Sequence, residues 1–566
     1  MGVPGFFAWL SRRYKKQLIQ RTRPMGGIDI LYLDANCLIH PECFRVLKEN
    51  PDWKSLPGLE KKMVNAVVQY IDHCIRVAMP KKKIFIAIDG VAPMAKVRQQ
   101  RLRRFRSVVE HEEIARIKEK HGEKVPAFWS NAAITPGTEF MWKLKKTIEK
   151  NFLLAKEKYG GVEVVFSTAN HPGEGEHKIM DDLRHQNVQG KNDSVAVYGL
   201  DADLIFLSLI QSGNRTGPVY LMREAAQVDR DGGGGDDGFC WVDVKALDSV
   251  VHDVFKKRGC DHPGVVNDFI FLCYFLGNDF IPALPSLDIY HFGIEAVLGA
   301  YKDAYEGHPL IIRNVQCVTE IDMIFFGRIV EKLARRETSV LRKDFEAEKD
   351  KKPKTPPRGD PTSGLAHDLW VYENTFPPHP NPIQLGSDKP VLWKKRYYQH
   401  YFEASTPVSR VCQDYMRGLL WTTRYYFDGC PSWRWFYHHD QGPFLSDLSG
   451  FLRHGKLRPI TFAPDHPIDI ILQLMIVLPQ KLWYLLPPFF RDRLRLEKDL
   501  VTAAHPETFE MDYLYKARVF QALPVLPRIP LKEFIVFVAG IKKYLRETKG
   551  HIKEKGYLRT LGESLN

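Results

Sequence analysis

Acidic residues stand at the ends of three apolar segments that the sequence predicts as strands. Asp34 ends IDILYLD, Asp89 ends IFIAID, and Asp201 follows VAVYGL, with Asp203 two residues later. In an open parallel sheet, ligands bind outside the carboxyl ends of the strands, so we expect these carboxylates to converge on one crevice. A single aspartate at a strand end is more often a helix cap or a turn residue, so the prediction depends on their number.

Further carboxylates occur in two segments that can reach the same crevice. HPGEGEHK places Glu174 and Glu176 beside glycines that let the backbone bend close to a metal or a phosphate, and Asp279 follows the apolar run FIFLCYF. Seven convergent carboxylates repel one another unless cations neutralise them, and all-oxygen ligands favour Mg²⁺ or Mn²⁺ over Zn²⁺. Two such ions about 4 Å apart can activate a water and stabilise the leaving oxygen of a phosphodiester. The acidic residues therefore predict a two-metal phosphodiesterase.

A basic segment, GVAPMAKVRQQRLRRFR, follows Asp89 directly. Helical spacing places four of its side chains on one face: Lys96, Gln100, Arg103 and Arg104. Like charges at this spacing are mildly destabilising on a solvated helix, so the face predicts a pocket for a phosphate. The alternative is a solvated basic face with general attraction to nucleic acid, and we prefer it for Arg98, Arg101 and Arg106.

Composition and charge narrow the class of protein. The chain has 566 residues, and 81 basic against 68 acidic residues give a net charge of +13, which favours a polyanionic partner. No apolar run approaches the roughly 18 to 20 residues of a membrane span, and the N-terminus lacks the layout of a signal peptide. Nine scattered cysteines with no C-x-x-C pair argue against a disulfide framework and a zinc knuckle. We therefore expect a soluble intracellular protein that does not contact a membrane.

Four regions are expected along the chain. Short β-branched runs alternate with amphipathic stretches in residues 1–230, which predicts an α/β fold with a mostly parallel central sheet and surrounding helices. The segment DGGGGDDG (231–238) reads as a surface loop. Residues 239–345 read as a helical part of the catalytic region, residues 346–388 as a linker, and residues 389–566 as a largely helical region that completes the substrate channel. The predicted strands are Ile28 to Leu33, Ile84 to Ile88, Val162 to Phe166 and Val195 to Leu200.

Seven segments occur together in an order that is highly specific: MGVPGFFAWLSRRY (1–14), LYLDANCLIH (31–40), FIAIDGVAPMAKVRQQRLRRFR (85–106), NAAITPGTEFM (131–141), HPGEGEHKIMDDLR (171–184), YGLDADLIFLSL (198–209) and DFIFLCYFLGNDFIP (268–282). Through them the chain resembles the 5′→3′ exoribonucleases of the Xrn type. A weaker likeness continues through 418–448 and 473–479, so the resemblance covers most of the chain. It implies a catalytic core similar to PIN domains and flap nucleases. Many members continue with further domains, whereas this chain ends at Asn566, so we expect a compact member.

The resemblance implies a role for each candidate residue. It makes seven carboxylates the ligands of two Mg²⁺ or Mn²⁺ ions: Asp34, Asp89, Glu174, Glu176, Asp201, Asp203 and Asp279. It makes Lys96, Gln100, Arg103 and Arg104 the pocket for a 5′-monophosphate, in which a cap or a triphosphate is too bulky. His40 would stack on a terminal base, opposite either Trp433 or Trp435, because stacking is sequence-tolerant. A structural histidine and core tryptophans remain the alternatives.

The resemblance also implies a reaction and a substrate. We expect a processive 5′→3′ exoribonuclease that hydrolyses 5′-monophosphorylated single-stranded RNA to mononucleotides in RNA decay, as a monomer without a small-molecule cofactor. A location in the cytoplasm is preferred over the nucleus, and protein partners are left open. The alternative enzyme is a structure-specific 5′ nuclease acting on DNA flaps, since the same carboxylate core serves that class. A catalytically inactive RNA-binding scaffold is disfavoured, because none of the seven carboxylates is missing.

Overall fold

The computed structural model describes residues 13–123, 128–153, 156–186, 191–225, 238–287, 293–350, 355–356, 363–455 and 457–547. Several sequence predictions therefore fall outside the described residues. They concern most of MGVPGFFAWLSRRY, the Gly-rich loop at 231–237, most of the Pro-rich segment 349–362, and the basic tail beyond residue 547.

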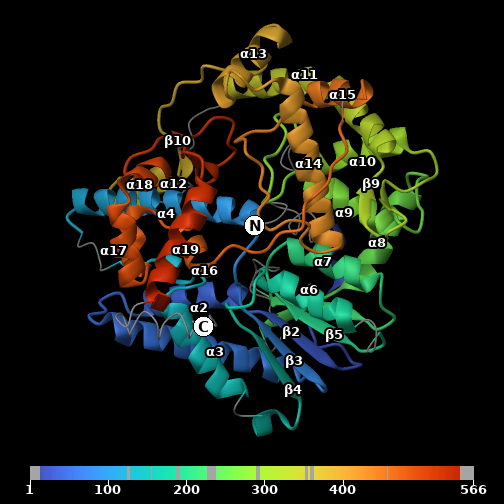
Figure 1. Cartoon of the computed structure of the whole chain (residues 1–566). Coiled ribbons are helices and arrows are strands. Elements are labelled where there is room, and N and C mark those ends of the chain that lie inside the picture. Colours follow the sequence, from blue (N-terminus) through green and yellow to red (C-terminus); the bar gives the residue numbers. More distant parts are fainter. Residues whose placement is uncertain are drawn as a thin grey trace.

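A seven-stranded sheet forms the base of the N-terminal region (Figure 1). Its order is β1-β7-β6-β5-β2-β3-β4, and all neighbours from β6 to β4 pair in parallel. The predicted parallel sheet is confirmed, with each predicted strand within two residues of an observed one. The strands are β1 (Ile19–Gln20), β2 (Ile30–Asp34), β3 (Lys83–Ala87), β4 (Glu163–Ser167), β5 (Val195–Tyr198), β6 (Val219–Glu224) and β7 (Phe239–Asp243).

The sheet extends past the boundary expected at residue 230. Strand β7 pairs antiparallel with both β6 and β1, so the segment 239–345 begins inside the sheet and is not purely helical. The same segment contains a small hairpin of β8 (Ile311–Arg313) and β9 (Thr319–Ile321). The apolar pattern of FCWVD is too short to distinguish a strand from the start of a helix.

Helices cover both faces of the sheet because successive strand residues point to opposite sides. Tyr32 and Phe85 pack in one core with α6 and α7, which Figure 1 shows directly above the strands. Leu31, Leu33 and Ile84 pack on the other face with α2, α3 and α5. The elements here are α2 (Asn36–Glu49), α3 (Leu56–Ala78), η1 (Asn131–Ala133), α5 (Glu139–Ile148), η2 (Glu149–Leu153), η3 (Lys156–Tyr159), α6 (Gly175–Gln186) and α7 (Asp203–Ser212).

A helical region extends the first of these cores. Residues 269 to 275 of α9 are buried on all sides, as the run FIFLCYF predicts, and they pack against α11 and α14. Helix α12 lies inside the segment expected as a linker. The helices are α8 (Val244–Lys256), α9 (Val265–Phe275), α10 (Gly293–Ala304), α11 (Met323–Lys349), α12 (Leu365–Asn374), α13 (Pro390–Tyr401), α14 (Val408–Phe427) and α15 (Leu445–Arg453).

Helix α4 (Met94–Lys120) joins the sheet to the C-terminal elements, beside which it lies in Figure 1. Met94 and Val97 share a core with α16, α17 and α19. The amide of Ala92 donates to Oε1 of Gln473 at 2.8 Å. The elements are α16 (Ile470–Val477), η5 (Gln480–Leu485), α17 (Pro488–Leu496), α18 (Lys498–Ala504), β10 (Met511–Asp512), η6 (Val519–Gln521), β11 (Leu523–Pro524) and α19 (Leu531–Glu547).

Three arginines of α4 contact protein, where we expected a solvated basic face. Arg101 is buried and donates to the carbonyls of Ala504 and Pro527. Arg98 pairs with Asp440, and Arg106 donates to the carbonyl of Phe520. The sequence prediction was wrong for these residues because the segments that contact them lie about 340 to 430 positions further along the chain.

Two expectations drawn from the sequence can be compared with this fold. Among the described helices none combines the length and the apolar character that crossing a bilayer requires. All nine cysteines lie in the described part of the chain, and none of them forms a disulfide there.

Replacing Arg101 by Ala is expected to lower the free energy of unfolding by roughly 2 to 4 kcal/mol, because the buried carbonyl of Ala504 and the carbonyl of Pro527 lose a charged donor. Urea unfolding of the full chain measures the change. Arg116→Ala is the control on the same helix, because Arg116 is exposed and its ion pair with Glu113 is one turn away on the same helix. Equal stability of both variants would contradict a structural role for Arg101.

Candidate functional site

Three of the predicted carboxylates lie at the ends of adjacent strands. Asp34 ends the central strand β2, Asp89 follows β3, and Asp201 follows β5. Gly175 lies against two of them, since a Cβ atom placed on it would be 2.6 Å from Oδ1 of Asp34 and 3.4 Å from Oδ1 of Asp89. A glycine is therefore required where α6 begins between these side chains.

The loop that carries Glu174 and Glu176 is held against the loop that follows β3. The amide of Gly90 donates to the carbonyl of Gly173 at 2.9 Å, and the amide of Gly173 donates to the carbonyl of Val91 at 2.8 Å. The approach is so close that a Cβ atom on Gly90 would lie 1.8 Å from the carbonyl oxygen of His171. This pairing places the E-x-E carboxylates next to Asp89.

Lys96 completes the cluster from the first turn of α4. Its Nζ lies 2.8 Å from Oε1 of Glu174 and 2.9 Å from Oδ2 of Asp279. Asp203, in the first turn of α7, is buried close enough for its charge to act on Lys96. The ammonium group therefore lies among the carboxylates, whereas the sequence led us to expect it on a phosphate with three other side chains.

Burial and mutual repulsion change the proton affinity of the carboxylates. Burial and the charges of Asp89 and Asp201 raise the pKa of Asp34 to about 8, and burial and the charge of Glu174 raise that of Asp89 to about 6. Burial and Asp279 raise the pKa of Asp203 to about 6. These charges link the predicted residues into one acidic cluster, which we define as Asp34, Asp89, Glu174, Glu176, Asp201, Asp203 and Asp279.

Lys96 shifts the proton affinity at one end of the acidic cluster in the opposite direction, at Asp279. Burial disfavours the charged forms of both partners, but the ammonium group lowers the pKa of Asp279 below its ordinary value. In return, Asp279 and Glu174 hold the pKa of Lys96 well above its usual range. At the other end, burial together with Asp203 and Glu174 raises the pKa of Glu176 well above that of a solvated glutamate.

The acidic cluster suits hard divalent cations. Oδ1 of Asp34 and Oδ1 of Asp203 are buried and have no hydrogen-bond partner among the described residues, so each is available to a ligand. Carboxylate oxygens are the ligands that Mg²⁺ and Mn²⁺ prefer. Asp201 differs from the other members because it is exposed, where it can reach an ion only from the solvent side.

His177 is a further candidate that the sequence analysis missed. One ligand atom each of Glu174, Glu176 and His177 lie within 4.8 Å of one another. Burial lowers the pKa of His177 to about 3, so the ring is neutral, and it stacks on Tyr425 with centroids 3.7 Å apart. The hydroxyl of Tyr425 donates to Oε2 of Glu174 at 3.0 Å. The motif G-E-H contained the signal, but nothing in it distinguishes a ligand from a packed histidine.

The remaining residues of the predicted phosphate pocket lie near His40. Burial together with the charges of Arg103 and Arg104 lowers the pKa of His40 to about 4. Arg104 donates to Oγ1 of Thr135 at 2.6 Å, while Arg103 is exposed. Oε1 of Gln100 and Nε of Arg104 are buried and have no partner within the described residues. This face of α4 therefore offers both cations and unused polar atoms.

The two tryptophans of SWRWFY have different surroundings. Trp435 packs on the core and stacks on Trp421, with ring centroids 5.4 Å apart. Trp433 has no ring contact within the described residues, and its carbonyl accepts a hydrogen bond from Met94 at the start of α4. Of the two, Trp433 is the one whose ring is not already stacked on another ring of the described residues, and its backbone lies at the start of α4.

Asp465 determines the shape of the loop that carries Trp433. Its carboxylate accepts hydrogen bonds from the Ser432 hydroxyl at 2.7 Å, from the amide of Trp433 at 2.5 Å, and from the amide of Arg434 at 3.1 Å. A carboxylate bound to two successive amides fixes the backbone of this loop. The sequence gives no sign of this contact, because Asp465 lies in an irregular segment about 30 residues later.

Two family models match the chain. The family described as XRN 5'-3' exonuclease N-terminus matches residues 1–225, and the family described as Xrn1 helical domain matches residues 260–361 and 381–554. The 5'-3' exoribonuclease 2 of Candida albicans is 27% identical over 96% of this chain and 72% of its own length. That of Arabidopsis thaliana is 28% identical over 96% and 68%. The 5'-3' exoribonuclease 1 of Saccharomyces cerevisiae is 27% identical over 97% of this chain but 43% of its own.

Gly175→Ala is expected to weaken Mn²⁺ binding about 10- to 100-fold, because the added methyl group displaces the carboxylates of Asp34 and Asp89. Isothermal titration with Mn²⁺ measures the affinity. Gly213→Ala is a matched control at the end of α7, where the nearest atom is at an ordinary 3.7 Å. Unchanged Mn²⁺ affinity in Gly175→Ala would place the metal elsewhere.

Metal affinity is expected to rise as the pH increases from about 6 to about 8. An ion binds the deprotonated carboxylates, and Asp34 and Asp203 lose their protons with pKa values of about 8 and 6. At pH 7, Mn²⁺ binding therefore releases protons, most of them from Asp34. Titrations in buffers of different ionisation enthalpy count those protons, and a count of zero at pH 7 would contradict the raised pKa of Asp34.

Proposed function

The chain belongs to the Xrn family of 5′→3′ exoribonucleases, and from this premise we propose how it acts. It removes mononucleotides from the 5′ end of single-stranded RNA that carries a 5′-monophosphate. Two Mg²⁺ or Mn²⁺ ions in the acidic cluster support the reaction. The observation that carries this proposal is the convergence of the carboxylates on Gly175, with two buried oxygens that no described residue uses.

Each residue of the acidic cluster, and Lys96 beside it, is assigned a role. Asp34, Glu176 and Asp203 would hold the ions, and Lys96 would keep Glu174 and Asp279 charged and in position. When bound, the ions supply the activation of a water and the stabilisation of charge on the leaving oxygen. The tyrosine hydroxyl on Glu174 fixes the direction of that carboxylate. Exclusion of water from the buried side of the acidic cluster strengthens each of these electrostatic interactions.

Selection of the 5′ end is assigned to α4. Gln100, Arg103 and Arg104 would hold the terminal phosphate, since guanidinium groups match phosphate oxygens in geometry and charge. Burial and the charge of Arg103 lower the pKa of Arg104 to about 9, which an anionic ligand would reverse. The Thr135 hydroxyl accepts a hydrogen bond from Arg104 and holds its guanidinium group in place.

Stacking is assigned to His40 and Trp433. His40 is neutral and lies beside the arginines, and Trp433 lies in the loop whose carbonyl caps α4. Two flat rings can hold the first bases without reading their sequence, which a degradative enzyme requires. Trp435 is assigned to the core, because it already stacks on Trp421.

The alternative of a DNA flap nuclease has no support in the comparisons, in which the relatives are named 5'-3' exoribonucleases. The monomeric state and the cytoplasmic location stay predictions. A comparison of RNAs with 5′-monophosphate, 5′-triphosphate and 5′-hydroxyl ends tests the proposal, with Mg²⁺ and with EDTA. Release of mononucleotides from the monophosphorylated RNA alone, and only with metal, is the expected result. Equal hydrolysis of all three ends would overturn the assigned end selection.

Arg104→Ala is expected to reduce the preference for 5′-monophosphate over 5′-hydroxyl ends by roughly 10-fold or more, because one charge-assisted contact is lost. The ratio of kcat/KM on the two RNAs measures this preference. Arg116→Ala is the control, since it removes the same charge from an exposed position on the same helix. An equal loss of kcat/KM on both RNAs would show that Arg104 attracts RNA in general and does not select the 5′ end.

A further inference from the structure

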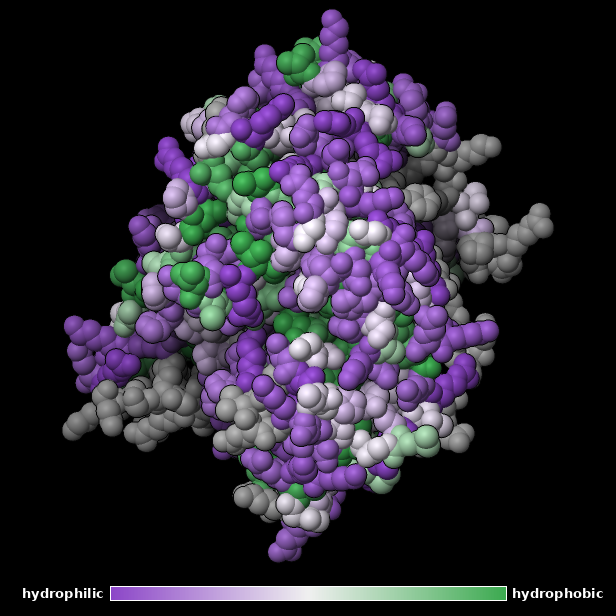
Figure 2. All heavy atoms as spheres, turned by 90° about the vertical axis from the view of Figure 1, so that its right-hand side faces the viewer, coloured by the Kyte–Doolittle hydropathy of each residue, from purple (hydrophilic) through white to green (hydrophobic). Residues whose placement is uncertain are grey.

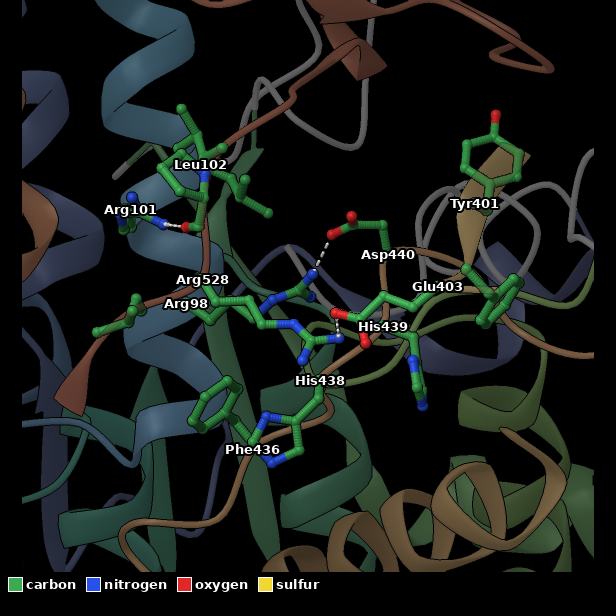
Figure 3. A pocket seen from close by; sticks show the side chains of 14 residues that line it. Arg98, Arg101, Leu102, Tyr401, Glu403, Phe436, His438, His439, Asp440 and Arg528 are labelled. Carbon is green, nitrogen blue, oxygen red and sulfur yellow. Dashed lines mark hydrogen bonds and ion pairs between the residues drawn. The ribbon is translucent and has the colours of Figure 1, made fainter. Parts of the chain in front are cut away.

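A cavity of about 200 Å³ lies on the side of α4 that faces the C-terminal elements, and no residue of the proposed phosphate pocket lines it (Figure 3). Arg98 and Leu102 of α4 form one wall, and the segment 436–440 forms another. Tyr401, Phe402 and Glu403 at the end of α13, together with residues 526–529, complete the lining. No residue of the acidic cluster contributes to it, so the cavity is separate from the site described above.

The lining combines flat side chains with hydrogen-bonding groups at their edges. Figure 3 shows Arg98 and Arg528 side by side, with Phe436 and His438 below them. The Phe436 and His438 rings have centroids 4.3 Å apart. Planar guanidinium groups and aromatic rings are the surfaces on which nucleobases stack. A volume of this size suits one base and not a large ligand.

Carboxylates at the rim make a free phosphate a poor occupant. Arg98 pairs with Asp440 at 2.5 Å, and Arg528 pairs with Glu403 at 3.0 Å, so both cations are already neutralised. The two carboxylates are largely exposed and keep lone pairs for another donor. A base with an exocyclic amino group supplies such a donor, as cytosine N4 does for Asp or Glu.

The cavity is connected to the proposed RNA site through one short segment. The chain that caps α4 with the Trp433 carbonyl continues directly to Phe436, His438 and Asp440 in the cavity wall. Three to seven residues separate these positions from Trp433, a span of at most about 25 Å for extended chain. A strand held at Trp433 can therefore place a later nucleotide at the cavity.

We propose that this cavity is a second nucleobase site, which binds one amino-bearing base by stacking against Phe436, His438 and the paired arginines. As a subsite for the RNA strand, it rests on the proposed function. A free mononucleotide has the same chemistry and is the other source of such a base. Occupation by the strand would hold the RNA between rounds of hydrolysis, which favours processive action.

Binding of 5′-monophosphorylated oligocytidylate 12-mers to the full chain in EDTA tests the proposal without turnover. His438→Ala and Arg528→Ala are expected to weaken binding roughly 5- to 30-fold, as removal of one stacked base does. Both side chains are exposed, so both variants should fold. Tyr484→Ala and Arg495→Ala remove an exposed ring and an exposed charge outside the cavity, and they are the matched controls.

A scan of 12-mers with one abasic nucleotide separates stacking from general attraction. At one position beyond the first bases, the abasic nucleotide should weaken binding to the wild-type protein but leave binding to His438→Ala unchanged. If no position has this effect, a titration with cytidine 5′-monophosphate tests whether the cavity binds a free mononucleotide. Binding of cytidine 5′-monophosphate by the wild-type protein that is lost in His438→Ala would assign the cavity to a free nucleotide. Absence of both effects overturns the proposal. Failure of the proposed function is distinguishable, because it appears as wild-type protein that releases no nucleotides with Mg²⁺.

Discussion

Repulsion among carboxylates at one edge of the sheet is the constraint on which the rest of the structure depends. Parallel strands bring Asp34, Asp89 and Asp201 to the same edge, and the loop before α6 adds two glutamates. Burial makes their repulsion more costly, as the raised pKa values of Asp34 and Asp203 show. Within the described residues, Lys96 supplies a positive charge directly to this group. Cation binding is therefore a condition for a fully charged acidic cluster.

Helix α4 connects this constraint to the C-terminal region. Its first turn delivers Lys96 to the acidic cluster, and its start is capped by the carbonyl of Trp433. Arg101, about one and a half turns after Lys96, donates to two carbonyls of the C-terminal elements. The space-filling view of the face opposite α4 shows a mostly hydrophilic surface with scattered apolar side chains (Figure 2). Helix α4 thus links the acidic cluster to the C-terminal elements through Lys96 and Arg101.

Local patterns were sufficient to predict four parallel strands and the acidic cluster, because each of these strands is one apolar run and each carboxylate lies in or directly beside a short recognisable segment. The antiparallel β7 escaped prediction because a five-residue apolar run has no distinctive period. Contacts between distant segments were also out of reach: Asp465 on the Trp433 loop, Tyr425 on Glu174, and the carbonyls on Arg101. The pairing of Lys96 with Asp279 could not be predicted, because it depends on where the loop after α9 meets the first turn of α4.

Anomalous diffraction from crystals grown with Mn²⁺ shows directly whether the acidic cluster holds metal ions. Anomalous density is expected between Asp34, Glu176 and Asp203, within coordination distance of the two oxygens that have no other partner among the described residues. A second peak is expected toward Asp201 or Asp279. Full-occupancy density elsewhere on the protein, with no metal in the acidic cluster at millimolar Mn²⁺, would show that the carboxylates do not form the metal site.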